Sequence, residues 1–159
     1  MPTYFVYPIY TIAIFILTYS IVPRQEIRYL IRYGIIFGAV TDAIMVIIFT
    51  KILGLGGYYN FGPFAFKGIP IFPLIAWAMY YVLYLYLLPK ANPWIYVFPI
   101  TAAFFSVLFS NILQNLGIFK WNWGTIVVPS IIYLVWHVTV TWIYLKIKLE
   151  NNSLFKNIS

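Results

Sequence analysis

Few side chains in this sequence can carry acid–base or nucleophilic chemistry. The 159 residues include three carboxylates, Glu26, Asp42 and Glu150, a single histidine, His137, and no cysteine. The absence of cysteine excludes disulfides, thiolate metal sites and cysteine nucleophiles. A lone histidine excludes bis-histidine haem ligation and a multi-histidine zinc site within one chain. We therefore predict neither a metal nor a cofactor.

Catalytic motifs that depend on local spacing are also missing. The run GLGG at 54–57 lacks the Lys-Ser/Thr of a phosphate loop, and no GxSxG elbow occurs. No paired carboxylates suggest glycosidase or aspartyl chemistry. A Ser–His–Asp triad could combine Asp42, His137 and either Ser106 or Ser110, but nothing in their spacing favours it. The sequence points to a non-enzymatic protein, and Asp42 and His137 are the catalytic candidates if it is an enzyme.

The elements that position these two residues are predicted to be membrane-spanning helices. Apolar residues make up 64% of the chain and charged residues 8%, whereas a soluble domain carries about a quarter charged residues. One span needs ~20 mostly apolar residues. We predict an all-α transmembrane bundle as a single domain over 1–148, followed by a short polar cytoplasmic tail at 149–159. About five spans are expected, near 4–22, 29–53, 69–88, 93–113 and 125–147.

The distribution of cations predicts the orientation. Lys and Arg collect at cytoplasmic ends of spans, and one set of predicted ends holds more of them: Arg24, Arg28, Arg32, Lys90, Lys146, Lys148 and Lys156, against Lys51, Lys67 and Lys120. We expect the N-terminus outside and the C-terminus in the cytoplasm of a multi-pass cell-membrane protein. Because the cations are scattered singly, the net charge of +7 indicates lipid headgroups and not nucleic acid as partners. A second copy or another membrane protein is the alternative partner.

Asp42 and His137 both fall near the middle of predicted spans. A mid-membrane carboxylate costs roughly 2.5–3.5 kcal/mol on insertion scales, so it must face the bundle or a wet cavity. Gly34, Gly38 and Asp42 are spaced by four and share one helix face, and Gly34 and Gly38 form a GxxxG pattern that allows close helix approach. We expect a midplane polar cluster centred on Asp42 and His137. It is either a hydrogen-bonded pair that fixes helix register or a binding or proton-handling site.

Further polar side chains extend this candidate site. In the fourth predicted span, small and polar residues recur at intervals of four, and in the fifth they share a stripe with His137. Arg32 lies one turn into the second span, from where its long side chain can reach the interface and a lipid phosphate. The predicted binding residues are Arg32, Tyr80, Tyr84, Ser106, Ser110, Asn111, Gln114, Tyr133 and Thr141.

Two features could shape a cavity. The segment 54–68, GLGGYYNFGPFAFKG, is too irregular for a full helix and is expected to form either an interfacial loop or a short re-entrant hairpin that caps a pocket. Pro8, Pro73, Pro99 and Pro129 lie inside predicted spans, where each can kink its helix.

Short motifs between residues 23 and 77 carry a family resemblance: PRQEIR at 23–28, GIIFG at 34–38, LGL at 53–55, PF at 63–64, GIPIF at 68–72 and AW at 76–77. They are similar to motifs of a group of small polytopic membrane proteins of spore-forming Firmicutes. That group has no assigned activity, so the resemblance implies a bacterial plasma membrane and no catalytic residues. The Gly-x-Pro turn at 68–70 also resembles, more weakly, membrane carotenoid cyclases and hydratases. The cyclases follow this turn with an acidic residue, where this sequence has Phe72-Pro73.

Three interpretations of function remain. The preferred one is a non-enzymatic structural, assembly or lipid-binding bundle. The second is a membrane enzyme or carrier that handles an apolar, isoprenoid-like substrate, with Asp42 and His137 at its polar centre. The third is a proton-coupled transporter, for which the spans give no sign of an inverted repeat.

Overall fold

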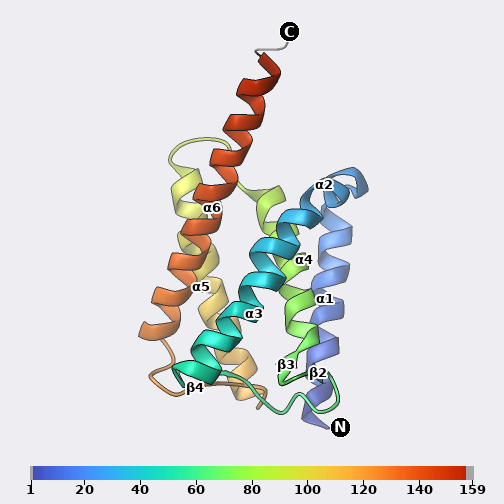
Figure 1. The fold of residues 1–159 in the computed structure, drawn as a ribbon, viewed down its shortest axis with the longest axis vertical. Coiled ribbons are helices and arrows are strands. Elements are labelled where there is room, and N and C mark those ends of the chain that lie inside the picture. Colours follow the sequence, from blue (N-terminus) through green and yellow to red (C-terminus); the bar gives the residue numbers. More distant parts are fainter. Residues whose placement is uncertain (1, 157–159) are drawn as a thin grey trace.

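The computed structural model describes the backbone of residues 2–156 and the side chains of residues 2–149. The chain is mostly helical, and successive long helices run in opposite directions (Figure 1). The helical elements are η1 (Thr3–Phe5), α1 (Val6–Ile21), α2 (Arg24–Gly34), η2 (Ile35–Val40), α3 (Thr41–Met45), η3 (Val46–Ile52), α4 (Ile71–Leu87), α5 (Trp94–Asn115) and α6 (Val127–Lys156). The strands are β1 (Gly56–Tyr58), β2 (Ala65–Phe66), β3 (Ile69–Pro70) and β4 (Phe119–Trp121).

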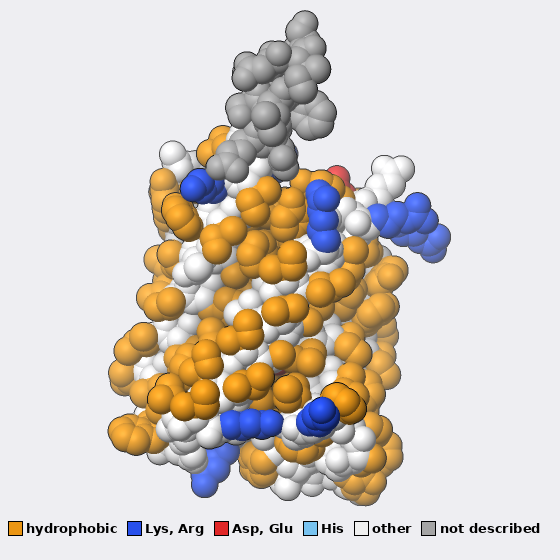
Figure 2. Space-filling model, in the orientation of Figure 1, with side chains coloured by type: hydrophobic (Ala, Val, Ile, Leu, Met, Phe, Trp, Pro, Cys, Tyr) orange, Lys and Arg blue, Asp and Glu red, His pale blue; other side chains and the backbone are white. Residues whose placement is uncertain are grey.

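In the part of the chain that the structure describes, four helices are long and apolar enough to cross a membrane: Thr3–Ile21, Arg24–Ile52, Trp94–Asn115 and Val127–Leu149. The prediction of a membrane-helix protein is confirmed at this level. α4 is also apolar but has only 17 residues. Large apolar side chains such as Ile16 and Phe104 point outward, with 62% and 60% of their surface exposed. Figure 2 shows a hydrophobic belt between two ends that carry the Lys and Arg side chains. A bilayer would cover such a belt, because water-soluble proteins rarely expose large apolar patches.

Residues Arg24–Ile52 form one continuous helix, which begins before the predicted start at residue 29. Within it, η2 and η3 are wider, π-helical segments, and they flank the short α-helical stretch α3 that carries Asp42. π-Helical turns are rare and occur frequently at functional sites. The carboxylate therefore sits where the helix geometry changes on both sides.

Gly34 and Gly38 bring this helix into close contact with α4, as the GxxxG pattern predicts. A Cβ atom at Gly34 would lie 2.5 Å from the backbone oxygen of Ala78, and one at Gly38 would overlap the backbone of Trp77. No side chain fits in that space. The two helices pack backbone to backbone along this face.

The helices form two groups. In the first, α4 packs against α1, α2 and η2; in the second, α5 packs against α6. Trp77 of α4 and Trp136 of α6 join the groups, with ring centroids 4.6 Å apart. The Trp136 indole N–H also donates to the Phe37 carbonyl oxygen at 3.0 Å. Aromatic side chains thus connect the two helix groups.

The strands close the end of the bundle where the N-terminus lies (Figure 1). β1 pairs antiparallel with β4, so that Tyr58 lies opposite Phe119, and β2 pairs with β3. The hydroxyl of Tyr7 lies 2.7 Å from the Tyr59 carbonyl oxygen and 2.6 Å from that of Ile118. It connects the segments that carry β1 and β4 to α1. The prediction of an all-α bundle with an irregular segment at 54–68 does not include these strands, because β1 in that segment pairs with the distant β4.

Several predicted boundaries also shift. Three of the four prolines, Pro8, Pro73 and Pro129, fall in the first turn of their helices, where proline is tolerated. Only Pro99 lies in the interior of a described helix, so it is the one of the four that interrupts the hydrogen bonds within a helix. α6 continues to Lys156, and the predicted tail from residue 149 begins as helix, with residues 157–159 outside the described part.

Candidate functional site

A cavity of about 470 Å³ lies between the two helix groups. Tyr10 of α1 and Trp77 of α4 line one side, and Ser106 and Phe109 of α5 line the other. Side chains from α6, β1 and β4 complete the lining. The cavity exists because α1 and α4 meet α5 through side chains and not through closely packed backbones.

The cavity lining is mostly apolar, with a few hydroxyl groups. These hydroxyls belong to Tyr10, Tyr58, Tyr80, Ser106 and Tyr133, which come from five different elements. A mainly apolar cavity with a few polar groups that fix orientation is typical of small-molecule sites.

One wall of the cavity faces the outside of the bundle. Phe105, Leu108 and Ile112 of α5 line the cavity and are also exposed, with 62%, 44% and 54% of their surface accessible. In a bilayer these side chains would meet lipid tails. A molecule dissolved in the membrane would therefore have a lateral route past α5.

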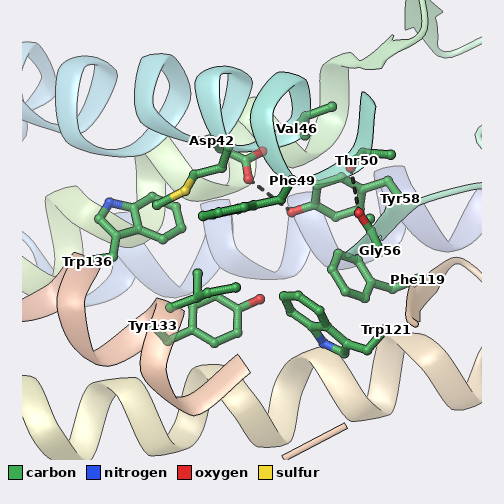
Figure 3. Close-up of a pocket in the computed structure, with 13 residues that line it drawn as sticks. Asp42, Val46, Phe49, Thr50, Gly56, Tyr58, Phe119, Trp121, Tyr133 and Trp136 are labelled. Carbon is green, nitrogen blue, oxygen red and sulfur yellow. Dashed lines mark hydrogen bonds between the residues drawn. The ribbon is translucent and has the colours of Figure 1, made fainter. Parts of the chain in front are cut away.

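A second, smaller pocket of about 40 Å³ surrounds Asp42 (Figure 3). Six of its thirteen lining residues are aromatic and come from η3, β1, β4 and α6. Tyr133 and Trp136 of α6 lie across the pocket from Asp42. Tyr58, Phe119 and Tyr133 line both this pocket and the large cavity. The two spaces therefore share one wall.

Asp42 has only one polar contact from the described part of the chain. The Tyr58 hydroxyl donates to Oδ1 of Asp42 at a long 3.4 Å, and the Trp77 indole N–H donates to the Tyr58 oxygen at 2.9 Å. Burial raises the pKa of the Tyr58 hydroxyl well above its ordinary value, so Tyr58 remains a hydrogen-bond donor at neutral pH. Oδ2 of Asp42 is buried without a hydrogen-bond partner among these residues.

His137 has its own, separate set of partners. Its Nδ1 lies 2.7 Å from the Tyr133 carbonyl oxygen, and its Nε2 lies 3.0 Å from the Tyr80 hydroxyl. A carbonyl oxygen only accepts, so Nδ1 carries the proton and Nε2 accepts from Tyr80. Within residues 2–149, no hydrogen bond joins His137 to Asp42. The predicted cluster centred on this pair is instead two sites, because each residue faces different elements.

The proposed triad has no geometric support. The Ser106 hydroxyl donates to the Ala102 carbonyl oxygen at 2.9 Å, and the Ser110 hydroxyl donates to that of Val107 at 2.8 Å. Both serines thus use their protons within α5, and His137 uses Nε2 for Tyr80.

The remaining predicted binding residues divide by location. Tyr80 and Tyr133 line the large cavity. Tyr84 and Thr141 are hydrogen-bonded to one another at 2.6 Å, between α4 and α6. Arg32 lies outside, with its guanidinium 4.5 Å from the ring centroid of neighbouring Tyr29.

Ser110, Asn111 and Gln114 fix the segment between α5 and α6. Oγ of Ser110 accepts from the Trp121 indole N–H at 3.2 Å, and Oε1 of Gln114 accepts from the Trp121 backbone N–H at 3.0 Å. The Asn111 amide donates to the Thr125 carbonyl oxygen at 2.9 Å. These side chains hold β4 in place, and they do not line the cavity.

Sequence reasoning missed several side chains around the two spaces. Tyr10, Tyr58, Trp77 and Trp136 were not among the predicted binding residues. For Tyr58 the aromatic segment 54–68 was a signal, but its contact with Asp42 depends on the pairing of β1 with β4.

Comparison with known proteins finds no matching family model, no matching curated protein and no matching solved structure. The two resemblances noted above therefore stay predictions. No group of three or more His, Cys, Asp or Glu that could hold a metal ion occurs in the described residues. The features that can support a function are the cavity and the buried Asp42 beside it.

Proposed function

We propose that this protein binds one apolar, isoprenoid-like molecule from the membrane, as a non-enzymatic binding protein or carrier. The observation that carries this proposal is the apolar cavity of about 470 Å³ between the helix groups. Its size lies within the range of roughly 300–1,000 Å³ typical of small-molecule sites. The exposed wall of α5 supports entry from the lipid. A purely structural bundle has no need for such a space, because packed interiors contain few voids larger than a water molecule.

The hydrogen bonds of the buried polar side chains favour a binding role over catalysis. Both ring nitrogens of His137 have hydrogen-bond partners within the bundle, so the histidine is held as a structural group. The hydroxyls of Ser106 and Ser110 donate to backbone carbonyl oxygens and have no base beside them. These contacts orient side chains, and they leave no activated nucleophile.

We further propose that the chain crosses the cell membrane five times, with α4 as the central span. α4 runs alongside α1 and the helix Arg24–Ile52 (Figure 1), although with 17 residues it is shorter than that 29-residue helix. It is surrounded by other helices, and residues such as Tyr81 and Val82 are fully buried. The excess of Lys and Arg at one set of ends favours an outside N-terminus and a cytoplasmic C-terminus.

This topology can be tested by single-cysteine labelling, because the natural chain contains no cysteine. Lys67 and Lys148 are both exposed and lie at opposite ends of the proposed bundle. In intact cells we expect a membrane-impermeant maleimide to label Lys67→Cys, and to label Lys148→Cys only after permeabilisation. Labelling of both positions in intact cells would contradict the odd number of spans, and the reverse pattern would contradict the orientation.

The binding proposal is tested by filling the cavity. Ser106→Phe places a ring in the cavity, and Thr101→Phe is its matched control. Both hydroxyls bond to the carbonyl oxygen four residues earlier in α5, but Thr101 is exposed and Ser106 is buried. We expect Ser106→Phe to weaken the binding of farnesol at least about tenfold, or 1.4 kcal/mol, and Thr101→Phe to leave it unchanged.

Native mass spectrometry from a mild detergent provides the measurement. It also shows whether an apolar molecule is retained from the membrane in stoichiometric amount. Equal farnesol binding by both variants would contradict the assignment to this cavity. A wild-type protein that neither retains nor binds an apolar molecule would contradict the proposed function.

A further inference from the structure

Among the described residues, two buried side-chain atoms have no hydrogen-bond partner, Oδ2 of Asp42 and the Tyr81 hydroxyl, and only the first belongs to an acidic group. Only 4% of the surface of Asp42 is exposed. The one contact of Oδ1, to Tyr58, is long at 3.4 Å. None of the described residues that line its pocket carries a positive charge. A buried carboxyl either takes up a proton or pairs with a positive charge, because an isolated buried charge is too costly. Since the described lining residues supply no cation, a charged partner for Asp42 would come from outside the chain.

The surroundings of Asp42 indicate the charge of that partner. Rings of Phe49, Tyr58, Trp121, Tyr133 and Trp136 line the same small pocket, and Figure 3 shows them grouped around it on the side to which the carboxylate points. The face of an aromatic ring carries partial negative charge and attracts cations, most strongly for Trp. A carboxylate among aromatic rings is a suitable site for an ammonium group. An anionic or purely apolar group would leave the carboxylate unpaired.

The size of the pocket limits what can enter it. A volume of about 40 Å³ exceeds the ~10–15 Å³ that one water molecule needs, but it is far smaller than an organic ligand. It can hold the ammonium group of a primary amine, while the rest of such a molecule must lie elsewhere. Tyr58, Phe119 and Tyr133 form the wall shared with the 470 Å³ cavity. Asp42 itself does not line that cavity, so the end group of an apolar chain in it reaches the carboxylate by displacing one of these three side chains.

We propose that the ligand of this protein is a lipophilic primary amine. Its ammonium group lies in the aromatic pocket and donates a hydrogen bond to Oδ2 of Asp42, while its apolar chain fills the cavity between α1, α4 and α5. This inference rests on the proposed function, since it names the end group of the molecule bound in the same cavity. Asp42 lies in α3, between the π-helical segments η2 and η3.

The test compares three ligands that differ only in their end group. Farnesylamine, farnesol and farnesoic acid share one apolar chain and are positively charged, neutral and negatively charged at neutral pH. Binding to the wild-type protein in a neutral detergent is measured by native mass spectrometry and by quenching of tryptophan fluorescence. We expect the amine to bind at least about tenfold more tightly than the alcohol, and the acid to bind most weakly.

Asp42→Asn keeps the shape of the side chain and removes its charge. In this variant we expect the amine to lose its advantage and to bind like farnesol, while farnesol binds as in the wild type. Glu26→Gln is the matched control, because Glu26 is an exposed carboxylate at the end of the bundle and its loss should change nothing. If Asp42→Asn does not fold, the comparison of the three ligands in the wild-type protein still shows whether the site prefers an ammonium group.

The outcomes separate this inference from the proposal on which it rests. Equal binding of amine and alcohol by the wild-type protein would overturn the ammonium site and leave the apolar cavity in place. An unchanged preference for the amine in Asp42→Asn would overturn the role of this carboxylate. Failure of all three ligands to bind would overturn the proposed function itself.

Discussion

Replacement of Gly38 by leucine is expected to prevent the bundle from assembling. A Cβ atom alone would overlap the backbone of Trp77, and backbone cannot move aside as a flexible side chain can. Overpacking of a well-packed interior usually costs about 1–3 kcal/mol, and more when backbone must shift. We expect a loss of about 3 kcal/mol or more in the free energy of unfolding, seen as aggregation or a large drop in Tm in detergent.

The control for this substitution is Val40→Leu, two residues along the same helix. Val40 is 47% exposed and would face lipid, so a larger apolar side chain there should change Tm little. If Gly38→Leu had the Tm of the wild-type protein, the close contact between this helix and α4 would be wrong. Gly34→Leu is expected to behave like Gly38→Leu, because it meets Ala78 and Val82 of the same helix.

Replacement of His137 by alanine is expected to have the second largest effect. The imidazole is fully buried and lies against the rings of Tyr80, Tyr81 and Tyr84. Its removal leaves a cavity and deprives the Tyr80 hydroxyl of its partner. Loss of a buried ring typically costs about 3–5 kcal/mol, and we expect unfolding measurements in detergent to show a loss in this range.

His137→Phe separates the packing of the ring from its hydrogen bonds. It restores most of the volume but leaves the Tyr80 hydroxyl and the Tyr133 carbonyl oxygen without the imidazole. An unsatisfied buried polar group costs about 1–3 kcal/mol, so His137→Phe should lie between His137→Ala and the wild type. A variant in which farnesol binding is lost at full stability would contradict the structural role given to His137.

The helices and their packing faces could be predicted because lipid imposes simple rules on sequence. A span must be long and apolar, and a carboxylate such as Asp42 must turn away from lipid. Gly34 and Gly38 marked the helix face that meets α4, because small residues allow two helices to approach closely. Asp42 and His137 both lie near the middle of predicted spans, and this position alone predicts that they are buried. The structure confirms that both are buried.

The side-chain partners of these two residues could not be predicted, because they lie on other elements: Tyr58 of β1 for Asp42, and Tyr80 of α4 for His137. Tyr58 reaches Asp42 only because β1 pairs with β4, whose residues lie about sixty positions later. The side-chain pattern of residues 56–58 does not predict that pairing. The π-helical segments around α3 were equally hidden: η2 packs against α4, and η3 packs against β1.

The proximity of Trp77 and Trp136 has a spectroscopic consequence. The two indoles belong to different helix groups, and their centroids lie 4.6 Å apart with the ring planes inclined by 41°. Two indoles held this close at a fixed angle couple their electronic transitions, which produces bands in the circular dichroism spectrum. These bands disappear when fixed tertiary packing is lost. Trp77 also lines the cavity, so its emission senses what occupies it. These two natural tryptophans thus report on the contact between the two helix groups, and no dye has to be attached.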